Sequence, residues 1–409
     1  MMALGRGFSQ WLAAARLLPP RQRADELLAG SDDLASAFNI LVTNWEQLLA
    51  RASSPQVRRR AEASIATLRH CQDRAAEYWT AGDPRVPILV TQWLGTRDWW
   101  WSGAAPSGYR IAIVSSRLPR LLEPNGPWLR AVRAALDWAH ERAAIIVAGW
   151  NTAGSELALR GAVRRGLTTV AIRCCDLKAR SIQTWTKQWA ASLKHSPGTG
   201  AIDLWALPVD MASAGPEPEP PSELYSVPEN DRAAFAWADE LIVLALRPGG
   251  NLHTLLRHRF AQPNARVFLV DLPGLQPARI RDELVPLGAM IWSPEKENTP
   301  KLSPSLITTN SQSVPARRDN PRSPVPVPSA DGWAFLTHCT RACVGPWPGQ
   351  SRDDYLDSLL DGGPDSDHSA VAALLRIVTR RRLVASSQAI RGRYPVVSFT
   401  AASLAELPR

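Results

Sequence analysis

The chain has 409 residues, of which 45% are hydrophobic and 21% charged, and its formal net charge at pH 7 is +9. This composition excludes a disordered or fibrous protein, and no apolar run is long enough for a membrane-spanning helix. The five cysteines lack the spacing of a disulfide framework, so we expect a protein of the reducing cytoplasm. The mild positive charge allows a nucleic-acid partner without indicating one.

Residues 1–85 are expected to form a helical N-terminal region. Apolar residues recur there at alternating steps of four and three, as on one face of an amphipathic helix: Leu34, Phe38, Leu41, Trp45 and Leu48. A further helix is expected over 57–78. A bundle packed on the next domain is the simpler interpretation, and a module that recognises a partner is the alternative.

The segment Val86–Gly103 is expected to be an apolar strand that ends in three successive tryptophans, Trp99, Trp100 and Trp101. Exposed aromatic rings can stack nucleic-acid bases. Because neighbouring strand residues point to opposite faces, at least one ring is expected to be buried. Burial is the favoured interpretation, and base stacking is the alternative.

Beyond residue 109 the chain alternates short apolar runs with amphipathic segments. The runs are predicted to be buried parallel strands, at 111–114, 144–148, 168–172 and 241–245. Helices are expected over 128–138 and 154–165. This alternation predicts an α/β fold, with a doubly wound, mostly parallel Rossmann-like sheet. The helical N-terminal region would precede the sheet, and a small C-terminal α+β segment would follow it.

Ligands of such sheets bind at the carboxyl ends of the strands, where helix N-termini offer N–H groups to anions. Three strand-end loops are therefore candidate phosphate or nucleic-acid sites. Their residues are Ser115, Ser116 and Arg117 in the first loop, Gly149, Asn151, Thr152, Gly154 and Ser155 in the second, and Arg247, Gly249, Gly250 and Asn251 in the third. Ordinary turns are the alternative, most of all for the third loop. No catalytic group is predicted, because no nucleophile–base pair, carboxylate pair or P-loop motif is present.

These loops resemble those of the DNA-processing protein A (DprA/Smf) family. AIVSSR is similar to that family's first strand and loop, VAGWNTAGSELALRGAV to its second strand, turn and helix, and residues 238–271 to a later stretch. The family's Gly before Ser-Arg is Ser115 here, and its Arg, Asp and His fall on Thr152, Ser155 and Leu159. The resemblance implies a Rossmann domain over 86–292 that binds single-stranded nucleic acid or a phosphorylated nucleotide. No cofactor or membrane is required, and a homodimer stays open.

A Pro/Ser-rich linker is expected over 293–330. Residues 331–409 resemble the beginning of a DarT-like ADP-ribosyltransferase domain. The matching residues are His338, Thr340, Ser398, Phe399 and Thr400, and the resemblance implies an NAD site at His338, Thr340 and Ser398. A downstream catalytic Glu is lacking, so a partner chain would have to complete the domain. The His and Cys spacing in this segment fits no zinc pattern, and no metal is expected.

We predict a nucleic-acid or nucleotide binding or sensing protein, and the pairing of the two resemblances suggests prokaryotic stress or phage defence. Two enzyme classes remain as alternatives. One is an NAD-dependent ADP-ribosyltransferase that a partner completes. The other is a nucleotide-processing enzyme of the lysine-decarboxylase-like Rossmann family, whose PGGxGTxxE motif is represented here by PGG alone, at 248–250.

Overall fold

The structure is a computed structural model. It describes residues 12, 17–20, 22–23, 31, 33–80, 82–116, 118–119, 122–124, 126–150, 152–174, 202–208, 220–294, 340, 342–343, 345–362, 366–384 and 397. The chain divides into two compact units, Met1–Pro294 and Glu295–Arg409. The division falls at the start of the expected linker, which lies outside the described residues from 295 to 330.

Among the helices whose bounds the structure describes, two precede the sheet in the first unit, α3 (Leu34–Arg51) and α4 (Pro55–Asp73). The first begins where the Asp33 side chain accepts a hydrogen bond from the Ser36 N–H at 2.7 Å. Its buried residues include Phe38, Leu41 and Trp45, so the predicted amphipathic face is confirmed. The second helix ends earlier than predicted.

The early end of α4 has a local cause. Ala75 adopts a left-handed conformation with φ of 52°, which a continuing helix does not allow. The chain then enters β1 (Glu77–Trp79), so Tyr78 lies in a strand and the helix predicted to reach it is wrong there.

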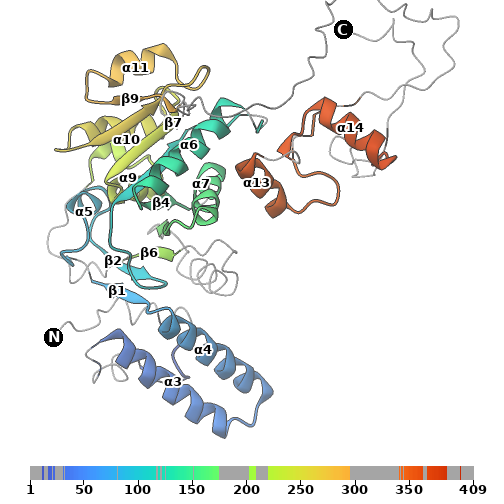
Figure 1. Cartoon of the computed structure of the whole chain (residues 1–409). Coiled ribbons are helices and arrows are strands. Elements are labelled where there is room, and N and C mark those ends of the chain that lie inside the picture. Colours follow the sequence, from blue (N-terminus) through green and yellow to red (C-terminus); the bar gives the residue numbers. More distant parts are fainter. Residues whose placement is uncertain are drawn as a thin grey trace, which may run out of the picture. The chain divides into compact units, whose positions relative to one another are not determined.

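A nine-stranded sheet forms the centre of the first unit (Figure 1). Its order is β1-β2-β6-β5-β4-β3-β7-β8-β9. The remaining strands are β2 (Arg97–Trp101), β3 (Arg110–Ser115), β4 (Ile145–Gly149), β5 (Thr169–Cys174), β6 (Ile202–Pro208), β7 (Glu240–Ala245), β8 (Arg266–Val270) and β9 (Met290–Trp292). The pairs from β6 to β9 are parallel, while β1 and β2 add an antiparallel edge. The predicted α/β class and Rossmann-like sheet are confirmed.

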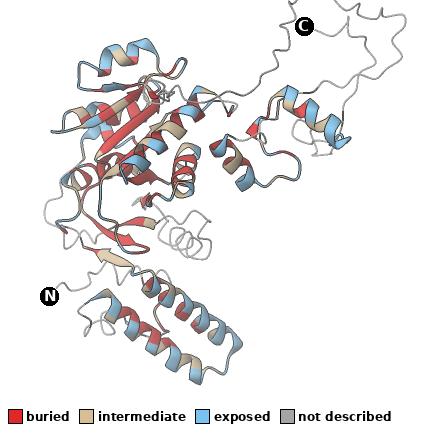
Figure 2. Ribbon diagram, viewed as in Figure 1, coloured by how far each residue is buried: buried red, intermediate tan, exposed pale blue. Residues whose placement is uncertain are grey.

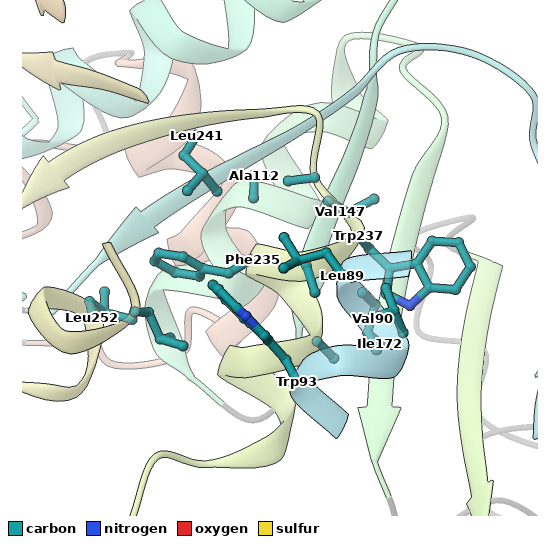
Figure 3. Close-up of a cluster of buried hydrophobic side chains, with 14 of the residues drawn as sticks. Leu89, Val90, Trp93, Ala112, Val147, Ile172, Phe235, Trp237, Leu241 and Leu252 are labelled. Atoms are coloured by element: carbon teal, nitrogen blue, oxygen red, sulfur yellow. The ribbon is translucent and has the colours of Figure 1, made fainter. Parts of the chain in front are cut away.

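Helices cover both faces of this sheet (Figure 1). On one face lie α6 (Pro127–Glu141) and α7 (Ala153–Arg164), both of which were predicted. The other face is covered by α5 (Ile88–Leu94), the short helix η1 (Ser222–Leu224), α9 (Glu229–Trp237), α10 (Asn251–Phe260) and α11 (Ala278–Leu284). Figure 3 shows this second core, in which Phe235 and Trp237 of α9 pack between α5 and strand residues such as Val147.

The segment before the tryptophans is a helix, α5, and the predicted apolar strand is wrong there. Gly95 ends the helix with φ of 74°. The buried residues of α5 are Leu89, Val90, Trp93 and Leu94, which form a stripe toward α9. Thr91 and Gln92 lie between these residues and are less buried, so the segment has the apolar and polar faces of an amphipathic helix.

The three successive tryptophans do lie on a strand, β2, and all three are buried. Figure 2 shows this strand in the colour of buried residues. Trp99 and Trp101 join the core that contains Trp237, with ring centroids 5.2 and 5.6 Å from that ring. Trp100 points to the opposite face and packs in the core of α3 and α4. Base stacking by these rings is therefore excluded, since none exposes more than 3% of its surface.

In the second unit the described residues form two helices, α13 (Arg352–Asp361) and α14 (Ala370–Arg380). Ser369 caps the second of these by accepting a hydrogen bond from the Ala372 N–H. Beyond residue 384, the expected C-terminal α+β segment lies outside the described residues apart from Val397. No described helix combines the length and the apolar character needed to span a membrane.

Candidate functional site

The sheet reverses its winding beside β3. From β3 the chain adds β4, β5 and β6 in one direction, then returns to β7 on the other side of β3 and continues to β8 and β9. Loops that leave neighbouring strands in opposite directions open a crevice at their carboxyl ends. A pocket of about 420 Å³ lies at this point. Its walls are the ends of β3, β4 and β7 and the first turns of α7, α9 and α10.

The structure brings residues of all three predicted loops into this one pocket. They are Ser115, Ser116, Gly149, Thr152, Gly154, Ser155, Arg247, Gly250 and Asn251. Gly249 is not among the lining residues and instead makes the turn before α10, with φ of 68°. Arg117 and Asn151 lie outside the described residues, so their predicted roles stay predictions.

The two serines of the first loop form hydrogen bonds that connect the segments lining the pocket. Trp128 donates its indole N–H to the Ser115 hydroxyl at 3.0 Å. Ser116 accepts the backbone N–H of Arg247 and donates to the Ala245 carbonyl at 3.3 Å. The hydroxyls thus join the end of β3 to α6 and to the loop after β7. Both hydroxyls therefore make hydrogen bonds within the fold, and these bonds position the loops that form the pocket.

In the second loop, Thr152 caps α7. Its hydroxyl oxygen accepts the Ser155 N–H at 3.1 Å and its hydroxyl lies 2.7 Å from that of Ser155. Packing explains why residue 149 is a glycine, because a Cβ there would lie 2.5 Å from the Asn230 carbonyl oxygen of α9. Close approach of a helix, rather than of a ligand, accounts for that glycine. Gly154 has more room, since the nearest atom to a Cβ would be a Trp128 carbon at 4.0 Å.

The third loop ends in a helix N-terminus without a side-chain cap. Gly250 is the N-cap of α10 and provides no side chain to accept the first N–H groups. Asn251 and Leu252, in the first turn, line the pocket. Arg247 lies exposed at the pocket, and its guanidinium has no partner among the described residues. An uncapped helix N-terminus beside an unpaired guanidinium favours an anion.

The pocket also contains a carboxyl group that the sequence analysis missed. Asp231 of α9 is half-buried and lines the pocket, and no hydrogen bond or ion pair joins its carboxyl group to any described residue. Burial raises the pKa of this carboxyl above its ordinary value. Asp is common in the first turn of a helix, so the sequence around Asp231 gives no sign that its carboxyl group lines a pocket.

Most residues predicted for an NAD site in the second unit lie outside the described part. This holds for His338 and Ser398, while Thr340 is described as a half-buried residue in irregular structure. His368 is buried and stacks on Trp347 with ring centroids 4.3 Å apart. Within the described residues, no group of His, Cys, Asp and Glu is arranged to hold a metal ion. NAD binding in this unit stays a prediction.

No protein-family model and no curated protein matches the chain. Among solved structures it is similar to DprA from Streptococcus pneumoniae, with 14% identity over 70% of this chain and 91% of that one, at a TM-score of 0.35. Another is DprA from Helicobacter pylori, a structure that concerns its single-stranded DNA binding mode, with 13% identity, coverage of 54% and 93%, and a TM-score of 0.34. A third is the molybdenum cofactor carrier protein of Chlamydomonas reinhardtii, with 11% identity, coverage of 45% and 89%, and a TM-score of 0.27.

Two of these three proteins belong to the family that the loop sequences resemble, and none of the three is an ADP-ribosyltransferase. The identities and TM-scores are low, so the likeness places neither a ligand nor an activity on this chain. What the site can bind follows from its own residues.

Proposed function

We propose that the first unit binds a phosphorylated nucleotide in the pocket at the strand ends, as a free molecule or at the end of a single strand. One observation carries this proposal: Arg247, without a partner in the described chain, and the uncapped N-terminus of α10 meet at one pocket. The pocket volume of about 420 Å³ lies within the range of roughly 300–1,000 Å³ typical of small-molecule sites.

The phosphate belongs at the α10 side of the pocket. A helix N-terminus carries roughly half a positive elementary charge, and α10 leaves its first N–H groups uncapped. At α7, by contrast, Thr152 already accepts the Ser155 N–H. Arg247 adds a full charge and a planar set of donors that suits phosphate oxygens.

The other walls suit the remainder of a nucleotide. Apolar side chains line much of the pocket, among them Val114, Phe235 and Leu244. A phosphate alone would leave this surface in contact with water, whereas a base or sugar would cover it. A site with a few polar groups on an apolar lining is typical of cofactor-sized ligands.

Single-stranded nucleic acid is the second ligand to test. Binding along a strand requires a basic groove that follows the backbone, and Arg247 is the basic side chain that lines the pocket within the described residues. A strand end therefore fits better than a continuous strand. A cytoplasmic sensor of such a ligand in stress or phage defence, as a homodimer or with a partner chain, is the finer proposal that builds on this one.

Isothermal titration of the full chain with nucleoside 5′-monophosphates and with short single-stranded oligonucleotides tests the proposal. Arg247→Ala should weaken nucleotide binding about 10-fold or more, because a charge-assisted contact is lost. Arg257→Ala removes the same charge from the last turn of the same helix, away from the pocket, and should change nothing. Equal affinities of the Arg247→Ala variant and the wild type would refute the proposed site.

A further inference from the structure

The Asp231 side chain differs from its neighbours in the first turn of α9, since it has no partner among the described residues. The Glu229 carboxylate lies 2.9 Å from Arg97 and 3.4 Å from Arg232. The Asn230 side chain accepts the Cys174 N–H at 2.7 Å and donates to the Trp150 carbonyl at 3.1 Å. Asp231 makes no such contact with the described residues and lines the pocket instead.

An unpartnered carboxyl group at a pocket is costly for the folded protein. Asp231 is half-buried, and removing part of a carboxylate from water without a compensating hydrogen bond is unfavourable. Here burial raises the pKa of Asp231, which is the expected sign of such desolvation. Groups with these properties in clefts are candidates for contact with a ligand.

The charge of Asp231 determines which part of a ligand it can meet. A carboxylate repels a phosphate, so the phosphate must lie away from it, beside Arg247 and α10. An ionised carboxylate is an acceptor only, with two oxygens that each take hydrogen bonds. It therefore requires donors, and a nucleotide offers them as sugar hydroxyls or as the amino groups of some bases. A vicinal diol presents two donors to two oxygens whatever the base.

We propose that Asp231 accepts hydrogen bonds from the 2′- and 3′-hydroxyls of the bound nucleotide, so that the pocket selects ribonucleotides over deoxyribonucleotides. This inference rests on the proposed function and narrows its ligand class. A free vicinal diol occurs on a mononucleotide or at the 3′ end of RNA and not within a DNA strand. The ligand is then a free ribonucleotide or an RNA end.

The test uses the full chain and three probes: AMP, 2′-deoxy-AMP and inorganic phosphate. In the wild type, AMP should bind about 10-fold more tightly than 2′-deoxy-AMP, since one hydroxyl contact to a charged group is missing in the latter. Asp231→Asn keeps the shape and removes the charge. It should lower AMP affinity about 10- to 100-fold, abolish the ribose preference, and leave phosphate binding equal or tighter.

Two controls separate the outcomes. Asp282→Asn makes the same change on the exposed surface of α11 and should leave all three affinities unchanged. Thermal unfolding of each variant verifies that it is folded. UMP and 2′-deoxy-UMP, which lack an amino group on the base, should show the same ribose preference as the adenine pair.

The sign of the Asp231→Asn effect decides the inference. If AMP binds the variant as tightly as the wild type or more tightly, the carboxylate only repels the phosphate and the inference is wrong. If the loss is confined to adenine nucleotides regardless of sugar, Asp231 contacts the base and the inference is also wrong. Both results leave the nucleotide site intact. If wild type binds no nucleotide at all, the proposed function fails as well.

Discussion

The tryptophan-rich edge of the sheet and the pocket at its centre differ in whether the fold buries or pairs their most conspicuous side chains. At the edge, Trp99, Trp100 and Trp101 are all buried. At the pocket, Arg247 and Asp231 are left without partners in the described chain. A residue's chemical type therefore indicates little about its function by itself. Whether the fold already satisfies a side chain decides whether a ligand can use it.

Buried charges elsewhere in the first unit support this distinction. Arg97 is paired with Glu229 at 2.9 Å, and Arg173 with Asp203 at 2.9 Å. Arg173 is also covered by the Trp150 ring, whose centroid lies 3.3 Å from the guanidinium carbon. Charges with such partners are part of the folded structure, and we assign no ligand to them.

The largest predicted effect belongs to the tryptophan edge. Trp237→Ala should lower the free energy of unfolding by about 3–5 kcal/mol, because the ring fills the space beside Trp79, Trp99 and Trp101. Denaturant unfolding measures this loss. Tyr225→Ala, at a ring that is 58% exposed, should change the stability by less than about 0.5 kcal/mol. Similar effects of the two substitutions would contradict the assignment of this edge to the core.

A slightly smaller effect is expected at the buried ion pair. Asp203→Asn leaves the Arg173 guanidinium buried without its counter-charge, which should cost about 3 kcal/mol of unfolding free energy. The measurement is again denaturant unfolding, with Asp137→Asn as the control, since the Asp137 side chain is 53% exposed in its pair with Arg165. A neutral result at Asp203 would show that the Trp150 ring suffices to satisfy Arg173.

Removal of the Asp231 charge should raise the free energy of unfolding. The folded protein binds the Asp231 proton more tightly than the unfolded chain does, because burial raises the pKa above the ordinary 3.8. Stability is therefore lost as the pH rises from that value through the folded pKa. Asp231→Asn should be about 0.5–2 kcal/mol more stable than wild type at neutral pH, and the difference should shrink as the pH falls through this window. A variant less stable at pH 7 would mean that Asp231 has a structural partner.

Much of this fold could be predicted from the sequence. The apolar runs at β3, β4, β5 and β7 are short and rich in Ile and Val, and strands buried on both faces have that composition. The rule that ligands meet the carboxyl ends of strands then placed three separate loops at one site. The α5 helix was missed because a short apolar run has the same composition in a buried helix and in a strand.

The roles of individual residues were harder to predict, because they depend on contacts between distant segments. From the sequence, Ser116 was a candidate phosphate ligand, yet its hydroxyl forms hydrogen bonds that connect the loop after β3 to the loop after β7. Gly149 reads as space for a ligand, yet the Asn230 carbonyl of α9 occupies that space. Asp231 stands out only once the fold shows that Glu229 is paired and Asp231 is not.

The most direct test of the central claim measures how much the phosphate group of a ligand contributes to binding, with and without Arg247. AMP and adenosine differ only in the phosphate, so the ratio of their affinities isolates its contribution. Wild type should prefer AMP by about 10-fold or more, and Arg247→Ala should lose most of that preference while its affinity for adenosine is unchanged. If AMP and adenosine bind wild type equally, or if Arg247→Ala keeps the full preference for AMP, the pocket is not the phosphate site described here.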